Sequence, residues 1–197
     1  MIKYPNGQNL TFSKNIKYKS KVEISISSAN RGMSLEADIN FSNDYYSSKG
    51  LCLITKRPTP INVVKVDYSK GARITDAYFE KQSTTDYNGV YKGRYIDFEA
   101  KSTKLRTSFP LSNISYHQIE HLEKVLFHDG IAFFIVEFST LDEIYLLDAK
   151  YVIDFYKKND RKSIPYEIFK KEGILIDKNY MPRLDYLKAV DIKYFAK

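Results

Sequence analysis

The chain has 197 residues, 43% of them hydrophobic and 28% charged, which is enough for one domain with a substantial core. Its 31 Lys and Arg outnumber its 24 Asp and Glu, and the resulting net charge of +7 favours a polyanionic partner. The single cysteine, Cys52, excludes an internal disulfide and a cysteine-based zinc cluster. Because no apolar run has the length of a membrane span or a signal peptide, we expect a cytoplasmic protein without a membrane partner.

The first 30 residues differ in composition from the rest of the chain. Residues 1–30 are rich in Lys, Asn and Ser and poor in large apolar side chains, so we predict a flexible basic arm there. Residues 31–197 are predicted to form a single domain. Its first element is a helix between Arg31 and Ser48, where apolar residues recur with helical spacing. Glu36 lies on this helix, away from part of the apolar side.

Two strand-like segments with a turn between them follow the first helix. The apolar run at 51–58 ends at prolines and is predicted to be a buried strand that leaves the core. Residues 61–80 contain two β-like runs around the turn Ser69-Lys70-Gly71, which predicts a hairpin. Its apolar alternation is poor, so we expect it to project from the body. The cations of this hairpin are Lys65, Lys70 and Arg73.

The remaining elements indicate a mixed α/β fold with helices on either side of a central sheet. Ser115 and Gln118 have the spacing of a capping box at the start of a helix. GIAFFIVEF is the most apolar segment and is predicted to be a central strand, with EIYLLDA beside it. The predicted elements are a strand at 90–101, a helix at 115–127, the central strand at 130–138, and helices around 149–158 and 163–172.

The strand at 90–101 carries charges on one face. Side chains alternate along a strand, so Asp97, Glu99 and Lys101 project to one side and the apolar residues between them to the other. Such a charge cluster is costly unless a cation or a tight ion pair relieves it. Mg²⁺ would do so, because it binds one or two carboxylates together with substrate phosphate oxygens. The lysine could then neutralise charge on a phosphoryl oxygen.

A simpler interpretation is a solvated strand face with a cross-strand salt bridge. Three neighbouring features favour a site instead. Asp86 lies upstream, glycines at 89 and 93 allow close backbone approach, and the strand leads into a basic, hydroxyl-rich loop, KSTKLRTS.

The sequence resembles the RecU Holliday junction resolvases of low-GC Gram-positive bacteria, which are dimeric nucleases of the PD-(D/E)xK, restriction-endonuclease-like fold. The resemblance runs through most of the chain in contiguous motifs. These are YPNG, NRGMSLEADI, KRPTPINVVKV, AYFEKQSTTDYNGVYKGRYIDFEAK, TSFPL, HQIEH and PRLDY.

The resemblance implies a role for most polar residues around the strand. Two carboxylates would hold Mg²⁺, with Mn²⁺ as a candidate substitute, and two neutral residues would complete the metal neighbourhood. It leaves Asp97 as a structural acid. The implied residues are Asp86 and Glu99 for the carboxylates, Thr84 and Gln118 for the neutral groups, Lys101 for transition-state stabilisation and Glu36 as an accessory acid.

The resemblance also implies a DNA surface and an assembly. The hairpin would be a protruding stalk that enters the centre of a four-way junction, and a homodimer would cut two strands. Recombinase and branch-migration proteins are candidate partners. The expected phosphate contacts are Lys65, Lys70 and Arg73 on the stalk and Lys104 and Arg106 after the catalytic strand.

Two other functions remain open from the residues. A protein of nuclease fold could bind branched DNA without cutting it. HQIEH at 117–121 also has the H-x-x-E-H spacing of inverted zinc peptidases, although no third ligand can be identified from the sequence.

Overall fold

The computed structural model describes residues 35–79, 84–158 and 161–196. The predicted basic arm at 1–30 lies outside these residues and stays a prediction. The helices are α1 (Leu35–Ser48), α2 (Tyr116–Phe127), α3 (Ala149–Lys158), α4 (Tyr166–Glu172) and α5 (Tyr186–Val190), with short helical turns at Leu111–Asn113 and Asp191–Phe195. The strands are β1 (Leu53–Lys56), β2 (Ile61–Asp67), β3 (Arg73–Phe79), β4 (Tyr87–Tyr91), β5 (Arg94–Thr103), β6 (Ser108–Pro110), β7 (Ile131–Phe138), β8 (Glu143–Asp148), β9 (Ser163–Pro165) and β10 (Ile174–Leu175).

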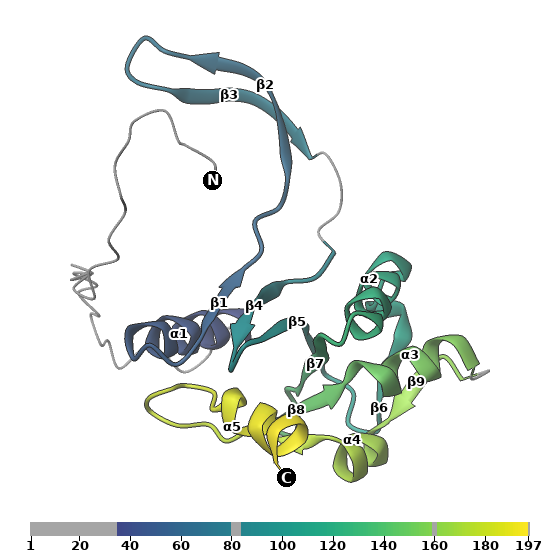
Figure 1. The fold of residues 1–197 in the computed structure, drawn as a ribbon. Helices are drawn as coiled ribbons and strands as arrows, with labels where there is room; N and C mark the ends of the chain where they lie inside the picture. The colour runs from purple at the N-terminus through teal and green to yellow at the C-terminus, as the bar shows by residue number, and fades with distance from the viewer. Residues whose placement is uncertain (1–34, 80–83, 159–160, 197) are drawn as a thin grey trace, which may run out of the picture. The chain divides into compact units, whose positions relative to one another are not determined.

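A six-stranded sheet in the order β1-β4-β5-β7-β8-β10 forms the centre of the fold (Figure 1). Only the β5–β7 pair in this sheet is parallel, because the chain returns through α2 between the two strands. Every residue of β7 except Glu137 is buried, which confirms the predicted central strand. The mixed α/β fold predicted from the order of elements is therefore confirmed.

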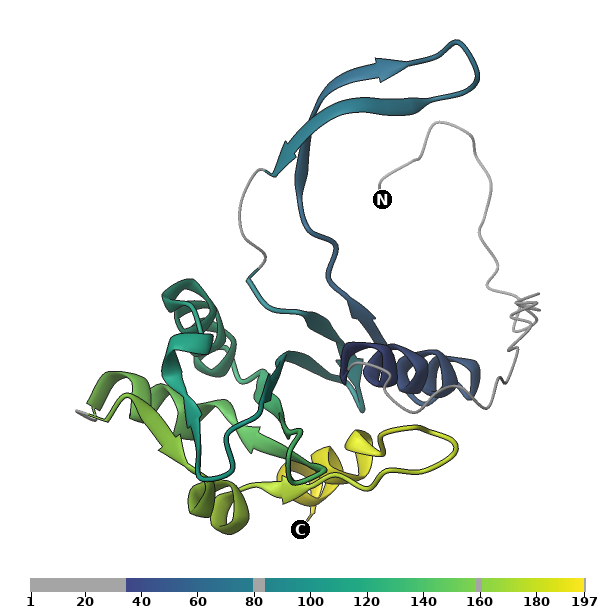
Figure 2. The ribbon, with the colours of Figure 1, turned by 180° about the vertical axis from the view of Figure 1, so that it is seen from behind.

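Helices cover both faces of the sheet. On one face, side chains of α1 and α5 share a core with Ile96 and Phe98 of β5. On the other face, α2, α3 and α4 pack against Phe134 and Val136 of β7. Figure 1 shows α1 beside β1, and Figure 2 shows α2 and α3 next to each other from behind. Among the described residues, no helix is long and apolar enough to cross a bilayer.

The predicted hairpin is present as a two-stranded sheet of its own, separate from the six-stranded sheet in Figure 1. Its strands β2 and β3 pair antiparallel, with a register irregularity near Lys65. All seven residues of β3 are exposed, so the hairpin gains little from burial and relies on its own pairing. This exposure agrees with the poor apolar alternation of its sequence.

Two predicted strands were wrong in detail. The segment at 51–58 is not a buried strand, because β1 forms the edge of the sheet and only Ile54 is buried. The strand predicted at 90–101 is two strands, β4 and β5, joined by a tight turn. Lys92 and Gly93 both have positive φ, at 48° and 77°, as the two-residue turns that match strand twist require.

Candidate active site

The site begins on β5, whose two faces differ sharply in chemistry. Ile96, Phe98 and Ala100 belong to the apolar core on one face, as the alternation predicts. Asp97 and Glu99 lie on the other face and are 0% and 1% exposed. The interpretation as a solvated strand face is therefore wrong, because two carboxylates are buried there and need compensating partners.

The β4–β5 hairpin brings Asp86 to Glu99. Tyr87 pairs with Phe98 across the hairpin, so the residue before Tyr87 lies level with the residue after Phe98. The Asp86 N–H donates to Glu99 Oε2 at 3.1 Å, and the Ala100 N–H donates to Asp86 Oδ2 at 3.1 Å. Two carboxylates distant in sequence thus share one site.

Close packing of β4 on β1 fixes this arrangement. A Cβ atom on Gly89 would lie 1.9 Å from the carbonyl oxygen of Leu53, so only glycine fits at this position. The rings of Tyr87, Phe98 and Phe133 stack across β4, β5 and β7, with centroids 4.9 and 4.7 Å apart.

The pKa of Glu99 is raised by its surroundings. Burial is the main reason that its pKa rises to about 7, and the nearby Asp86 charge raises the pKa further. Lys101 opposes the shift, since its Nζ lies 2.7 Å from Glu99 Oε1. A carboxyl group that titrates near neutrality is typical of functional sites.

Gln118 reaches the same carboxylate from α2. Its Nε2 donates to Glu99 Oε1 at 2.6 Å. Its Oε1 accepts the Ser115 N–H at 3.0 Å, which confirms the predicted capping box. Gln118 therefore links the helix start to Glu99 and directs its amide nitrogen, not its oxygen, to the carboxylate.

Thr84 and Glu36 differ in their partners at the site. The Thr84 Oγ1 atom is buried and has no hydrogen-bond partner among the described residues, which leaves an oxygen lone pair available two residues from Asp86. Glu36 instead forms an ion pair with Lys56. Hydrogen bonding to Glu36 is the main reason that the pKa of Lys56 is raised, with Asp86 contributing a smaller part. No sequence pattern singles out Lys56 as a neighbour of the site.

Asp97 is the centre of a second polar cluster, which the sequence pattern does not predict. Its Oδ2 accepts hydrogen bonds from Arg57 Nη2 at 2.7 Å and from the Tyr95 hydroxyl at 2.7 Å. His121 Nε2 lies 2.8 Å from the same oxygen. The Thr85 hydroxyl donates to Oδ1. Since the partners lie up to 40 residues away in sequence, only the fold reveals this cluster.

The histidines of HQIEH do not form a peptidase-like metal site in the described part of the chain. Nε2 of His121 faces the carboxylate of Asp97. No group of three or more His, Cys, Asp and Glu residues among the described residues is placed to hold a metal ion. The H-x-x-E-H spacing is therefore better explained by one histidine that orders an acid on β5.

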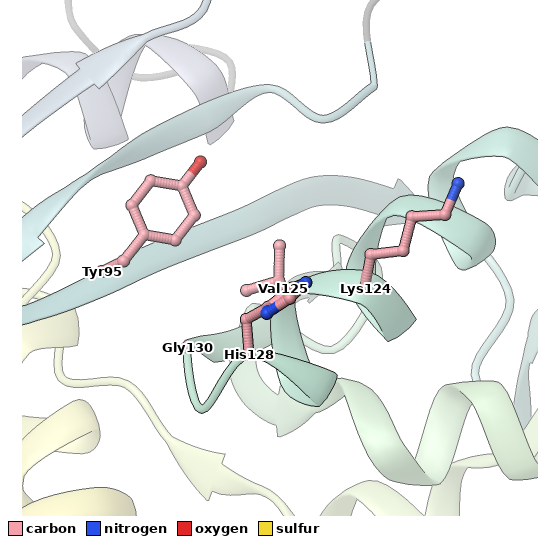
Figure 3. A pocket seen from close by; sticks show the side chains of 5 residues that line it. All are labelled: Tyr95, Lys124, Val125, His128 and Gly130. Atoms are coloured by element: carbon pink, nitrogen blue, oxygen red, sulfur yellow. The ribbon is translucent and has the colours of Figure 1, made fainter.

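The predicted DNA contacts lie on exposed surface. Lys65, Lys70 and Arg73 are on the hairpin, and Lys104 and Arg106 are on the loop after β5. A shallow hollow of about 330 Å³ lies beside β5, lined by Tyr95, Lys124, Val125, His128 and Gly130. Figure 3 shows the Tyr95 side chain across this hollow from the C-terminal end of α2.

Comparisons with known proteins point to one family. The family model described as "RecU: Recombination protein U" matches residues 30–192. The chain is 48% identical over 200 residues to proteins named Holliday junction resolvase RecU from Bacillus cytotoxicus and Bacillus cereus, covering 99% of each sequence. The solved structure of Hjc, a Holliday junction resolvase from Archaeoglobus fulgidus, matches 69% of this chain and 93% of that chain at 11% identity. Its TM-score is 0.39.

Proposed function

The chain belongs to the RecU family, and from that membership and the geometry of its site we propose that it is a metal-dependent Holliday junction resolvase. It cuts paired strands of a four-way DNA junction by hydrolysing phosphodiester bonds. This activity serves homologous recombination and DNA repair. We also propose a cytoplasmic location, because bacteria such as the Bacillus species of the relatives keep their DNA there.

One observation carries the proposal: Asp86 and Lys101, both only partly buried, converge on the buried carboxylate of Glu99. Two of the contacts use backbone N–H groups that β-strand geometry holds in place. A buried carboxylate beside a second acid lowers stability unless cations compensate its charge. We therefore assign the catalytic chemistry to these three residues.

The donor set fits a divalent cation. Asp86 and Glu99 supply two carboxylates, and Thr84 adds a buried hydroxyl without a partner among the described residues. Mg²⁺ suits such oxygen ligands, since it binds one or two carboxylates and completes its shell with water and phosphate oxygens. Mn²⁺ should substitute. When bound, the ion would polarise the scissile phosphate and stabilise the negative charge that develops on it.

Other residues of the site would position the catalytic groups and contact the DNA. Glu99 holds Lys101, whose side chain is still 25% exposed, so the ammonium group can meet a phosphoryl oxygen and neutralise transition-state charge. Gln118 holds Glu99 in one rotamer through its amide nitrogen. Glu36 and Lys56 form an exposed pair at the border of the site, where the lysine can contact a DNA phosphate once the pair opens.

Selectivity for junctions requires more than this site. We propose that the protein acts as a homodimer, because two symmetric cuts need two active sites and a two-fold assembly matches a two-fold substrate. The exposed hairpin would enter the junction centre, with Lys65, Lys70 and Arg73 on phosphates. Lys104 and Arg106 would hold the backbone beyond the catalytic strand. Recombinase and branch-migration proteins remain candidate partners.

The first prediction compares four-way junction, linear duplex and single-stranded DNA as substrates. The wild-type protein should cut the junction in Mg²⁺ and not in a chelator. Lys101→Ala should lower the single-turnover rate by about 100-fold or more while junction affinity changes little, because the lysine acts in the transition state. Gel-resolved cleavage and a separate binding titration measure the two quantities.

The controls separate the alternative functions. Lys188→Ala removes one exposed cation from α5, which packs on the sheet face opposite α2, and should cut like wild type. Junction binding without cutting in Mg²⁺ or Mn²⁺ would favour the binding protein of nuclease fold. Casein hydrolysis with Zn²⁺ would favour the peptidase.

A further inference from the structure

The cluster around Asp97 lies directly beside the catalytic residues and has no part in the chemistry proposed above. Asp97 and Glu99 are two residues apart on the same face of β5, about 6.7 Å along the strand. This separation is similar to that between neighbouring phosphates along a DNA strand. Asp97 is 0% exposed, so the cluster is built into the fold and is not a chance surface contact.

The two clusters are arranged in parallel by the same two elements. Gln118 and His121 are three residues apart on α2 and therefore share one face of the helix. Gln118 contacts Glu99, and His121 contacts Asp97. The groups around Asp97 thus continue the line of groups around the catalytic carboxylate.

Asp97 presents two basic side chains to the surface of the site. Arg57 and His121 are each anchored on its Oδ2, yet their side chains remain 25% and 24% exposed. Arg57 has five N–H donors, and its hydrogen bonds to Asp97 and to the Tyr95 hydroxyl both use Nη2. A guanidinium that is partly exposed and fixed by a buried carboxylate is well suited to bind a phosphate oxygen.

The Asp97 cluster is also joined to the backbone that carries Asp86. The Arg57 N–H donates to the Asp86 carbonyl oxygen at 2.7 Å. Thr85, the residue before Asp86, donates its hydroxyl to Asp97. A phosphate held by Arg57 would therefore be fixed in register with the catalytic carboxylates.

We propose that Arg57 and His121 form a subsite for the DNA phosphate next to the one that is cut, with Asp97 as the positioning residue that orients both. The ligand is a phosphodiester anion of the cleaved strand. The subsite rests on the proposed resolvase function and extends it. It sets which bond of a bound strand reaches Glu99 and Lys101, since holding one phosphate fixes where its neighbour lies.

The test pairs a change in the protein with a change in the DNA. Junctions are synthesised with one neutral methylphosphonate in place of the phosphate on the 5′ or the 3′ side of the cut bond. With wild-type protein, one of these two junctions should be bound about tenfold more weakly than the unmodified junction, because a charge-assisted contact is lost. Binding is measured with Ca²⁺ in place of Mg²⁺.

Arg57→Ala should remove this difference. The affinity of this variant for the unmodified junction should be about tenfold lower than that of wild type. Its affinity for the methylphosphonate junction should be no lower still, because the contact with that phosphate is already absent. The slope of log affinity against log salt should fall by about one. Lys188→Ala, which removes one charge on the other face, should keep the full methylphosphonate penalty. Arg57→Lys, which keeps the charge, should restore part of the affinity.

Asp97→Asn tests the positioning role. It removes the charge that orients Arg57 and His121 but keeps the size of the side chain, and it should reduce the methylphosphonate penalty. A thermal melt of the variant checks that it is folded at the temperature of the binding assay. If the penalty is the same in Arg57→Ala as in wild type, or absent in wild type, the subsite is wrong. If unmodified junction is neither bound nor cut by wild-type protein, the resolvase function itself fails.

Discussion

At the scale of single residues, the candidate active site combines groups whose charges oppose each other. Asp86 and Glu99 share one hydrogen-bonded site, although both are acids, and Glu99 is buried. Lys101 and Gln118 stabilise the negative charge of Glu99 only in part, because burial still raises the pKa of Glu99 to about 7. The proposed divalent cation would relieve the unfavourable charge that Lys101 and Gln118 leave on Glu99.

The second prediction concerns stability and pH in a chelator. Because the pKa of Glu99 is raised from 4.5 to about 7 on folding, its contribution to stability is full below about pH 4.5 and is lost as the pH rises through about 7. Glu99→Gln cannot titrate there. Between pH 5 and pH 8, wild type should lose about 1 to 3 kcal/mol of unfolding free energy relative to Glu99→Gln.

Urea unfolding at several pH values measures this difference. Parallel pH profiles for wild type and Glu99→Gln would contradict the raised pKa of Glu99. Added Mg²⁺ should oppose the loss at pH 8 in wild type, because a ligand that binds only the folded state stabilises it.

At the scale of elements, short sequence patterns predicted strand faces, a helix start and the central strand, because neighbouring residues determine each of these features. The alternation of Ile96 and Phe98 with acidic residues was sufficient to assign both faces of β5. The capping box of Ser115 and Gln118 located the start of α2 within one residue. The apolar run of β7 identified the central strand.

Tertiary partners explain what the sequence could not predict. The sequence around Asp97 does not distinguish it from other acids on strands. Its partners Arg57 and His121 are 40 and 24 residues away in sequence, and only the fold brings them to it. The turn at Lys92-Gly93 was visible in principle, because a residue followed by glycine between two strands favours a two-residue hairpin. β1 was misjudged because an apolar run does not distinguish an edge strand from a central one.

The third prediction concerns the hairpin β2–β3. Replacing residues 63–78 with a short Gly/Ser turn should lower affinity for the four-way junction far more than for linear duplex, because only the junction has an open centre. The central sheet should be unaffected, since the hairpin strands pair only with each other in the described residues. Affinities for both substrates are compared at one fixed salt concentration.

A charge variant separates shape from charge in this element. The triple change of Lys65, Lys70 and Arg73 to Ala keeps the hairpin backbone and removes its cations. The triple variant should bind both junction and duplex more weakly. The slope of log affinity against log salt should also become shallower, because phosphate contacts are lost. Equal losses on junction and duplex in the hairpin replacement would mean that the element supplies positive charge alone.

At the scale of the whole molecule, the proposed catalytic residues and the proposed recognition hairpin meet at the edge strand β1. The six-stranded sheet holds the acids on β5, and the exposed hairpin leaves the sheet immediately after β1. Arg57 lies at this exit and bonds both to Asp97 and to the backbone of Asp86. Residues 57–60, between β1 and β2, therefore connect the proposed recognition element to the proposed catalytic centre on the β1 side.

The most direct test of the resolvase function is the position and pairing of cuts in a four-way junction whose four strands carry different labels. We predict Mg²⁺-dependent nicks at symmetric positions in two opposite strands, with ends that DNA ligase reseals and with no cuts in Lys101→Ala. Cuts on one strand only, cuts at equal rates in linear duplex, or wild-type cutting by Lys101→Ala would contradict this function.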